Sequence, residues 1–226
     1  KQHSFLFAHI KKLRIPPKLK TLEANWCQFL YDLTDIEISP KNHLFDYFEN
    51  KYLLRKSHEG SAIFDELCFA RQDIVDAIIP SQIKTIKYLA FYHLKKIKTV
   101  EFLPNSKLEC MEGYAFASSS IEKVTVTSKS VKICDWCFNS CNNHVFVSFP
   151  NAEQITFQSL SFLNCSEKAK ILVQREAELT GAEKVKDKIS YIEKSKTSKK
   201  KMEAKDNEPK KKGKSGKEKD DEDDPK

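Results

Sequence analysis

The sequence predicts a repeat solenoid, mainly β, with short helical or 3₁₀ turns and a parallel sheet. The first observation behind this prediction is a set of four Phe residues that recur 25, 22 and 24 positions apart. The second is an apolar residue five positions before each of them. Such a period is typical of stacked coils, in which no unit can bury its apolar face alone. The four pairs are Ile86/Phe91, Met111/Phe116, Ile133/Phe138 and Phe157/Phe162.

Each unit also contains two apolar residues, two positions apart, in an extended segment that follows the Phe. The segment is clearest at residues 121–126, where Val124 and Val126 alternate with polar residues. Stacking the units in register would place these segments side by side as a parallel sheet. The predicted inward pairs are Val100/Phe102, Val124/Val126, Val145/Val147 and Ile171/Val173.

The same template extends toward the N-terminus. Leu22 and Cys27 stand five apart, as Ile86 and Phe91 do. In the unit before theirs, Phe5 takes the position that Phe116 takes in its own unit. The sequence therefore predicts a solenoid over residues 1–173 that begins inside a repeat, and we expect the chain to be a fragment of a longer product.

Residues 41–78 interrupt the rhythm. Two apolar stretches, 50–55 and 62–67, flank the turn sequence Ser-His-Glu-Gly at 57–60, which predicts an inserted β-hairpin. The regular pattern returns at Ile79. An alternative treats Phe69 as the aromatic residue of an ordinary unit, because it stands 22 residues before Phe91.

After Val173 the pattern stops. Residues 174–194 carry Val185, Ile189 and Ile192 at helical spacing, which predicts a capping helix. Residues 195–226 hold twelve Lys against nine Asp and Glu and one large apolar residue, Met202. This composition predicts a disordered tail.

Composition excludes several classes of protein. The tail accounts for +3 of the net charge of +7, so the predicted solenoid is only mildly basic. Five Gly in the whole chain argue against Gly-rich phosphate loops, and the sequence has no run of 18 apolar residues that would predict a transmembrane helix. Most of the seven Cys fall on repeat positions, which favours buried thiols in the core.

Two groups of residues invite a chemical interpretation. Cys134, Cys137 and Cys141, with His144, have spacing that a zinc site could use. Cys137 and Cys141 take inward repeat positions, however, whereas Cys134 aligns with polar residues. His58-Glu59 and Asp65-Glu66 are interpreted as a solvated hairpin turn instead of an acid–base pair. We therefore predict no catalytic residue, no metal site and no cofactor.

The strands offer the best predicted binding surface. Residues between the inward positions should point outward, and Phe146 and Leu172 would then form an apolar patch on neighbouring strands. In the alternative interpretation, the capping segment covers Phe146. The predicted binding residues are Glu37, Glu101, Lys123, Thr125, His144, Phe146, Lys170 and Leu172.

The repeat resembles that of the BspA-like leucine-rich repeat family. Ile79-Pro80, Ala90-Phe91 and Leu94 match its pattern almost completely, and Cys137-Phe138 with Cys141 matches well. The resemblance implies a leucine-rich-repeat solenoid that acts in surface adhesion or host interaction. It also implies a host or surface protein as partner, and a location on the cell surface or outside the cell.

A second function remains open from the residues themselves. Lys210, Lys211, Lys212 and Lys214 form a basic tract that could bind nucleic acid or an anionic surface, so the alternative is an intracellular scaffold. The sequence opens with no signal-peptide pattern, and a truncated N-terminus would hide one. A cytoplasmic location therefore remains an alternative to the surface.

Overall fold

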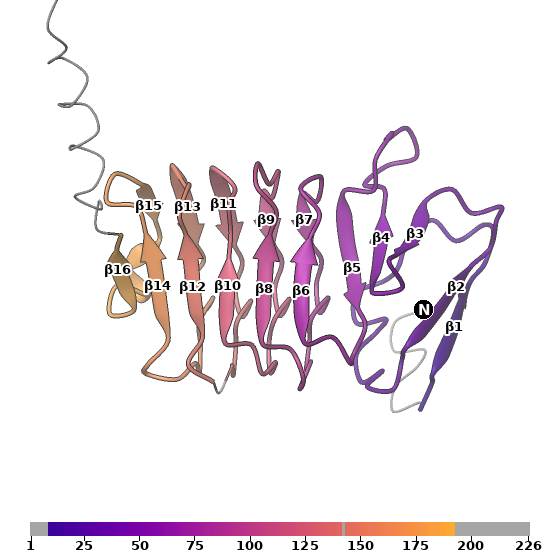
Figure 1. Ribbon diagram of the computed structural model, residues 1–226, viewed down its shortest axis with the longest axis horizontal. Helices are drawn as coiled ribbons and strands as arrows, with labels where there is room; N and C mark the ends of the chain where they lie inside the picture. Colours follow the sequence, from indigo (N-terminus) through magenta and orange to yellow (C-terminus); the bar gives the residue numbers. More distant parts are fainter. Residues whose placement is uncertain (1–8, 142, 193–226) are drawn as a thin grey trace, which may run out of the picture. The chain divides into compact units, whose positions relative to one another are not determined.

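The computed structural model describes residues 9–141 and 143–192, which wind into a β-solenoid with two parallel sheets (Figure 1). One strand of each coil joins a six-stranded sheet, and the strands of successive coils pair in parallel. In order, its strands are β6 (Asp76–Ile79), β8 (Thr99–Phe102), β10 (Lys123–Thr125), β12 (Phe146–Phe149), β14 (Lys170–Val173) and β16 (Ile189–Tyr191).

The second strand of each coil joins an eight-stranded sheet, which ends in two antiparallel strands. These two sheets confirm the predicted repeat solenoid. The strands are β3 (Phe45–Phe48), β4 (Tyr52–Arg55), β5 (Glu66–Ala70), β7 (Thr85–Ile86), β9 (Cys110–Met111), β11 (Ser130–Ile133), β13 (Gln154–Phe157) and β15 (Glu178–Thr180).

The four recurring Phe residues form a ladder of stacked rings inside the solenoid. Ring centroids lie 4.9 Å apart between Phe91 and Phe116, 5.1 Å between Phe116 and Phe138, and 4.8 Å between Phe138 and Phe162. All four side chains are buried. The predicted repeat period is thus the period of a continuous aromatic core, in which each ring packs on the next coil.

The strand register confirms most inward pairs and corrects one. Val100 pairs with Val124, and Val124 pairs with Val147, so the inward pair of β12 is Val147 and Phe149. The predicted pair Val145/Val147 was wrong by two positions. Val145 misled the prediction because it is also fully buried, although it lies just before the strand.

Two cysteines of the turn region stabilise the backbone of the preceding coil. The Sγ–H of Cys141 donates to the carbonyl oxygen of Phe116 at 3.3 Å, and that of Cys165 donates to Phe138 at 2.8 Å. Each carbonyl oxygen also accepts a backbone N–H, from Ser119 and from Cys141 respectively, so the thiol donates to its second acceptor site.

The inserted hairpin is confirmed. The alternative, an ordinary unit around Phe69, is right about its strand, β6, and wrong about its aromatic residue. β4 and β5 pair antiparallel, with Arg55 opposite Glu66. Phe69 does not join the ladder but packs on Trp26 with centroids 5.8 Å apart, while Tyr52 lies at the ladder's end, 6.5 Å from Phe91. The regular pattern returns earlier than predicted, because β6 already pairs in register with β8.

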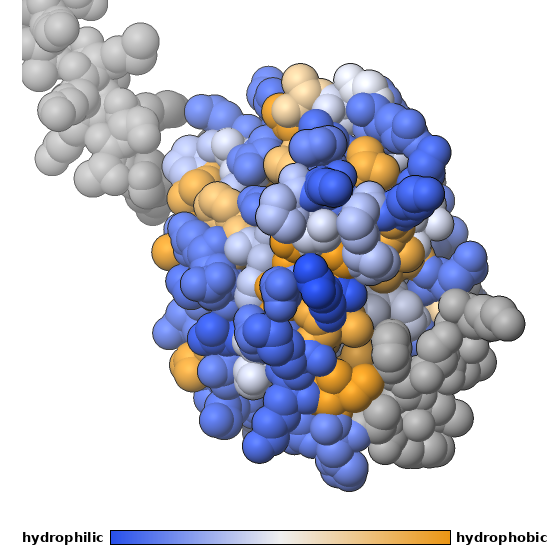
Figure 2. Space-filling model, turned by 90° about the vertical axis from the view of Figure 1, so that its right-hand side faces the viewer, coloured by the Kyte–Doolittle hydropathy of each residue, from blue (hydrophilic) through white to orange (hydrophobic). Residues whose placement is uncertain are grey.

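The N-terminal coils form a separate small sheet. β1 (Lys12–Ile15) and β2 (Asp35–Ile38) pair in parallel, with Leu13 opposite Ile36, as the repeat template predicts. Their apolar residues belong to a second core cluster with Trp26 and Phe69. Figure 2 faces this end of the solenoid and shows hydrophobic groups between hydrophilic ones.

The predicted capping helix over 174–194 is wrong. Residues up to Ile192 instead form another coil: β15 pairs with β13, β16 pairs with β14, and a single 3₁₀ turn, η1 (Ala182–Lys184), lies between them. Val185, 23 residues after Phe162, is buried in the same core cluster. The three-residue strands are too short to show an alternation that distinguishes them from a helix.

The predicted tail, residues 195–226, lies outside the described residues, as does Phe5. Over the part of the chain that the structure describes, no helix has the length and apolar character needed to cross a membrane.

Gly181 provides a test of this last coil. Its φ is +69°, and a Cβ added there would lie 2.0 Å from the carbonyl oxygen of Phe157 in β13. Gly181→Ala should therefore lower the free energy of unfolding by about 1–3 kcal/mol or more, measured by urea denaturation. The control is Gly60→Ala, whose added Cβ would make only an ordinary contact with His58 at 3.5 Å. Equal stability of the two variants would show that residues 174–192 do not pack on β13.

Candidate functional site

The outward side chains of the six-stranded sheet form one continuous surface, called the strand face here. Along β6, β8, β10 and β14 they alternate with buried residues, so the surface follows from the same pattern that builds the core. On β12 the outward Ser148 is itself buried. Strand pairing aligns them in two rows across the coils. One row is Asp76, Thr99, Lys123, Phe146 and Lys170, and the other is Ile78, Glu101, Thr125, Ser148 and Leu172.

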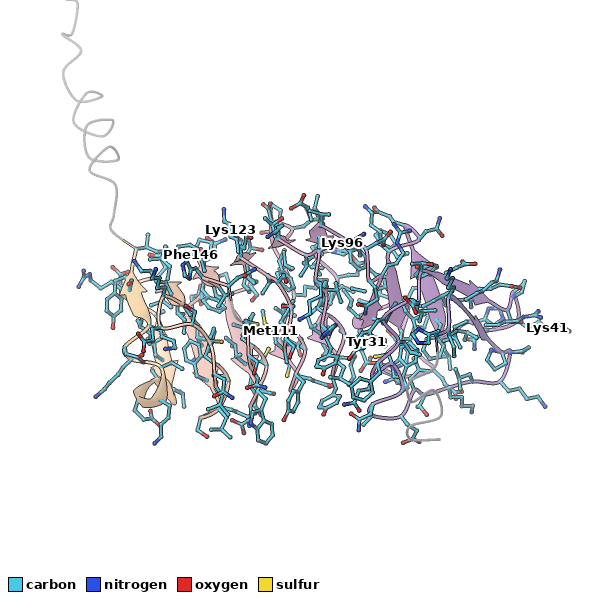
Figure 3. The ribbon with its side chains drawn as sticks, turned by 90° about the horizontal axis from the view of Figure 1, so that it is seen from below. Tyr31, Lys41, Lys96, Met111, Lys123 and Phe146 are labelled. Carbon is cyan, nitrogen blue, oxygen red and sulfur yellow. The ribbon has the colours of Figure 1, made fainter. Side chains whose placement is uncertain are left out.

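Apolar groups are exposed at both ends of the strand face. Ile78 is 58% exposed and Leu103, just after β8, is 41% exposed. Phe146 and Leu172 are half-buried on the neighbouring strands β12 and β14. Figure 3 shows Lys123 and Phe146 on the same side of the ribbon, whereas Met111 lies inside the coil. Apolar side chains exposed beside charged ones are typical of protein contact surfaces.

Polar contacts between coils order part of this surface. The hydroxyl of Thr99 donates to the carboxylate of Asp76 at 2.6 Å, and Lys98 forms an ion pair with Glu122 on the next coil. The hydroxyl of Thr127 donates to the carbonyl oxygen of Leu103 at 2.6 Å. These side chains are therefore held by their neighbours, which limits the entropy they would lose on binding.

The structure gathers six of the predicted residues on the strand face and separates two. His144 is exposed in the loop before β12, where its Nδ1 lies 3.4 Å from the Ser166 hydroxyl. Glu37 lies on β2, in the separate N-terminal sheet, within 3.5 Å of Lys12 and 3.6 Å of Arg14. Lys210, Lys211, Lys212 and Lys214 lie outside the described residues.

Sequence reasoning missed three residues of the strand face, whereas the fourth one absent from the predicted binding residues, Thr99, lies at an outward position that the repeat predicted. Asp76 and Ile78 were assigned to the hairpin insertion. Ser148 was missed because the predicted inward pair of β12 was two positions too early. A signal for Ser148 was present: Val147 stands nine residues after Phe138, as Val100 stands nine after Phe91.

A second surface, also missed, is a line of half-buried aromatic rings at the turns, called the aromatic edge here. Tyr88 and Tyr114 have centroids 5.6 Å apart, and Tyr114 stacks on Trp136 at 5.4 Å. Each stands two or three residues before a ladder Phe, so its period was visible in the sequence. Because the rings of Tyr114 and Trp136 stack on each other, they present edges to solvent more than faces.

A cleft of about 280 Å³ opens where the N-terminal coil meets the eight-stranded sheet, lined in part by Arg55, Cys68, Lys87 and Glu112. Its charges are paired: Arg55 lies 2.6 Å from Glu66, and Lys87 forms an ion pair with Glu112. Burial alone would lower the pKa of Lys87, but the hydrogen bond and the charge of Glu112 raise it by more, so the pKa lies above its ordinary value. Burial also raises the pKa of the Cys68 thiol. Groups held in this way stabilise the fold and are poorly suited to acid–base or nucleophilic work.

The hairpin carboxylates are structural, which corrects their interpretation as a solvated turn. Asp65 is buried and accepts hydrogen bonds from the backbone N–H and hydroxyl of Ser57, at 2.8 and 3.0 Å. Glu66 is buried against Arg55. His58 and Glu59 at the tip are exposed, as expected.

The cysteines proposed and rejected as zinc ligands point in different directions. Cys134 is half-buried at the surface, whereas Cys137 and Cys141 are fully buried in the core. Among residues 9–141 and 143–192, no three His, Cys, Asp or Glu side chains converge in a way that could hold a metal ion.

Comparisons with known proteins agree with this architecture. A family model described as the BspA type leucine rich repeat region matches six copies over residues 62–181, more than half of the chain. Comparison with curated proteins gives no match.

Two crystal structures match this chain, and the first of them is similar in fold. One is the pneumococcal vaccine antigen PcpA, with 16% identity and a TM-score of 0.51, covering 80% of this chain and 54% of that one. The other is a leucine rich cell surface protein from Faecalibacterium prausnitzii A2-165, with 17% identity and a TM-score of 0.48, covering 83% and 52%. The chain thus spans about half the length of each.

The environment of His93 predicts a pH dependence of stability. The His93 ring lies 4.3 Å from that of Tyr31, and burial, followed by the charge of Lys95, lowers the pKa of His93. The folded state therefore binds fewer protons than the unfolded state near the ordinary histidine pKa of about 6.5. Stability from this residue is complete above that pH and is lost as the pH falls below it.

Urea denaturation between pH 7.5 and 5 measures the effect. His93→Gln should remove part of the loss of stability at low pH, whereas the matched change His144→Gln, in the exposed loop before β12, should leave the profile as in the wild type. Parallel profiles for wild type and His93→Gln would refute the assignment.

Proposed function

The chain belongs to the family of BspA-type leucine-rich repeat proteins, and on this premise we propose that it is a non-catalytic protein-recognition module of a cell surface, with the strand face as its contact surface. The observation that carries the proposal is the presence of exposed Ile78 and Leu103, and of half-buried Phe146 and Leu172, among ordered polar side chains on one sheet.

Rigidity supports the proposal. The inward half of each strand is locked in the core, so the outward half is presented in a fixed geometry. A partner then loses little entropy in ordering the surface, and its affinity depends on a few central apolar contacts. Lys123 and Lys170 flank Phe146, and Glu101 lies beside Ile78, so charges of both signs would select the partner's orientation.

The comparisons support the cellular side of the proposal. One of the similar proteins is a cell surface protein and the other is a vaccine antigen, and these properties belong to those two proteins. The surface location of this chain, and a host or surface protein as its partner, are our proposals. The alternative of an intracellular scaffold with a basic tail rests on residues that the structure does not describe.

Site-specific photocrosslinking tests the contact surface. A benzophenone side chain is placed at Thr125 on the strand face or, as the matched control, at Thr156 on the opposite sheet; both Thr are half-buried on outer faces. The labelled full chain is then irradiated on intact cells of the source organism and of candidate hosts. The proposal predicts discrete protein adducts from position 125 and few from 156.

The same cells carry the remaining controls. Ile78→Lys should reduce the adduct yield about tenfold, the effect of replacing an apolar contact with a charged side chain. Antibody against the native protein should stain intact cells of the source organism. Equal adducts from both positions would overturn the strand face as the contact surface, and staining only after permeabilisation would overturn the surface location.

A further inference from the structure

Two cysteine side chains meet on the outer side of the eight-stranded sheet. Cys110 lies in β9 and Cys134 directly follows β11 on the next coil, with their Sγ atoms 3.7 Å apart. Both residues are half-buried, whereas Met111 and Ile133, which alternate with them, are fully buried. The two thiols therefore face away from the core and can be reached from solvent.

We propose that Cys110 and Cys134 form a disulfide bond between neighbouring coils when a disulfide oxidant is present. The sulfurs are in van der Waals contact and must approach to about 2.05 Å. Cys110 lies opposite Lys132 in the register, so the pair is diagonal. Although β11 ends at Ile133, the backbone N–H of Cys134 still donates to the carbonyl oxygen of Met111, so the distance must close mainly by side-chain rotation, with only a small backbone movement.

The remaining thiols are placed less favourably. Cys27, Cys68 and Cys137 are buried, which shields them from a reagent. Cys141 and Cys165 also interact with each other, but Cys141 is fully buried, and both donate their S–H groups to backbone carbonyls of the preceding coil. In the Cys110–Cys134 pair, by contrast, the two sulfurs are in contact and both residues are partly exposed to solvent.

The chemistry is thiol–disulfide exchange. The Cys134 thiolate attacks one sulfur of glutathione disulfide and releases one glutathione thiolate; the Cys110 thiolate then attacks the Cys134 sulfur and releases the second. The two cysteines lose two electrons and two protons, and the reagent is reduced to two glutathione molecules. Burial, followed by the neighbouring Cys134, raises the pKa of Cys110 to about 12. The contribution from Cys134 disappears once that sulfur is bound in the mixed disulfide, which eases the second step.

The bond would close a loop of one coil, since the two residues are 24 positions apart. It would connect two coils that are otherwise joined across the sheet by the short β9–β11 pairing. An oxidising environment would therefore link two central coils of the solenoid covalently and stabilise their packing. This inference does not depend on the proposed recognition function, and either can fail without the other.

Thiol counting on the full chain tests the proposal. The reduced protein, with seven Cys, is equilibrated in glutathione buffers of increasing oxidised fraction, quenched with acid, denatured and alkylated. Intact mass should show a loss of two alkylated thiols, leaving five, and peptide mapping should find Cys110 linked to Cys134. The oxidised protein should also melt at a higher temperature than the reduced one.

Two variants serve as controls. Cys110→Ser should keep all six of its thiols free, and Cys165→Ser, which retains a hydroxyl donor, should keep the link and leave four. Circular dichroism confirms that each variant is folded. Seven free thiols in the oxidising buffers, a link between Cys134 and Cys137, or a stable glutathione adduct on Cys134 without the second step would overturn the proposal.

Discussion

Each coil of this protein can bury its apolar interior only against the coils on either side, and the stacked Phe ladder is where that dependence is greatest. Phe116 and Phe138 each have an aromatic neighbour above and below, at 4.8–5.1 Å. The parallel sheets and the turn geometry all keep these rings in register. Outward side chains take no part in the stack, so they can be selected for binding while the core stays constant.

The same constraint explains how much of the fold could be predicted from the sequence. In the middle coils the spacing of Phe91, Val100 and Val124 predicts the observed register, because every inward position is fully buried. Prediction fails where another element fills the interior. Tyr52 reaches the end of the ladder from an antiparallel strand, and no spacing in the sequence reveals that. Residues 174–192 were misassigned because strands of three residues carry too little alternation.

The candidate site was predictable to the extent that the register was. Lys123, Thr125 and Leu172 were predicted correctly because their coils were aligned correctly, whereas Ile78 was missed because the hairpin insertion was extended too far, to residue 78. The thiol pair shows a further limit. The repeat template placed Cys134 at an outward position, but its contact with Cys110 is diagonal between coils, and a linear template compares only equivalent positions.

A double-mutant cycle along the Phe ladder tests the central claim of nearest-neighbour stacking most directly. Phe116→Leu and Phe138→Leu, alone and combined, are compared by urea denaturation with the separated pair Phe91→Leu and Phe138→Leu. Direct stacking predicts a coupling energy of about 0.5–3 kcal/mol for the adjacent pair and additivity within about 0.5 kcal/mol for the separated pair. Additive effects in the adjacent pair, or equal coupling in both, would contradict a solenoid held together by contacts between neighbouring coils.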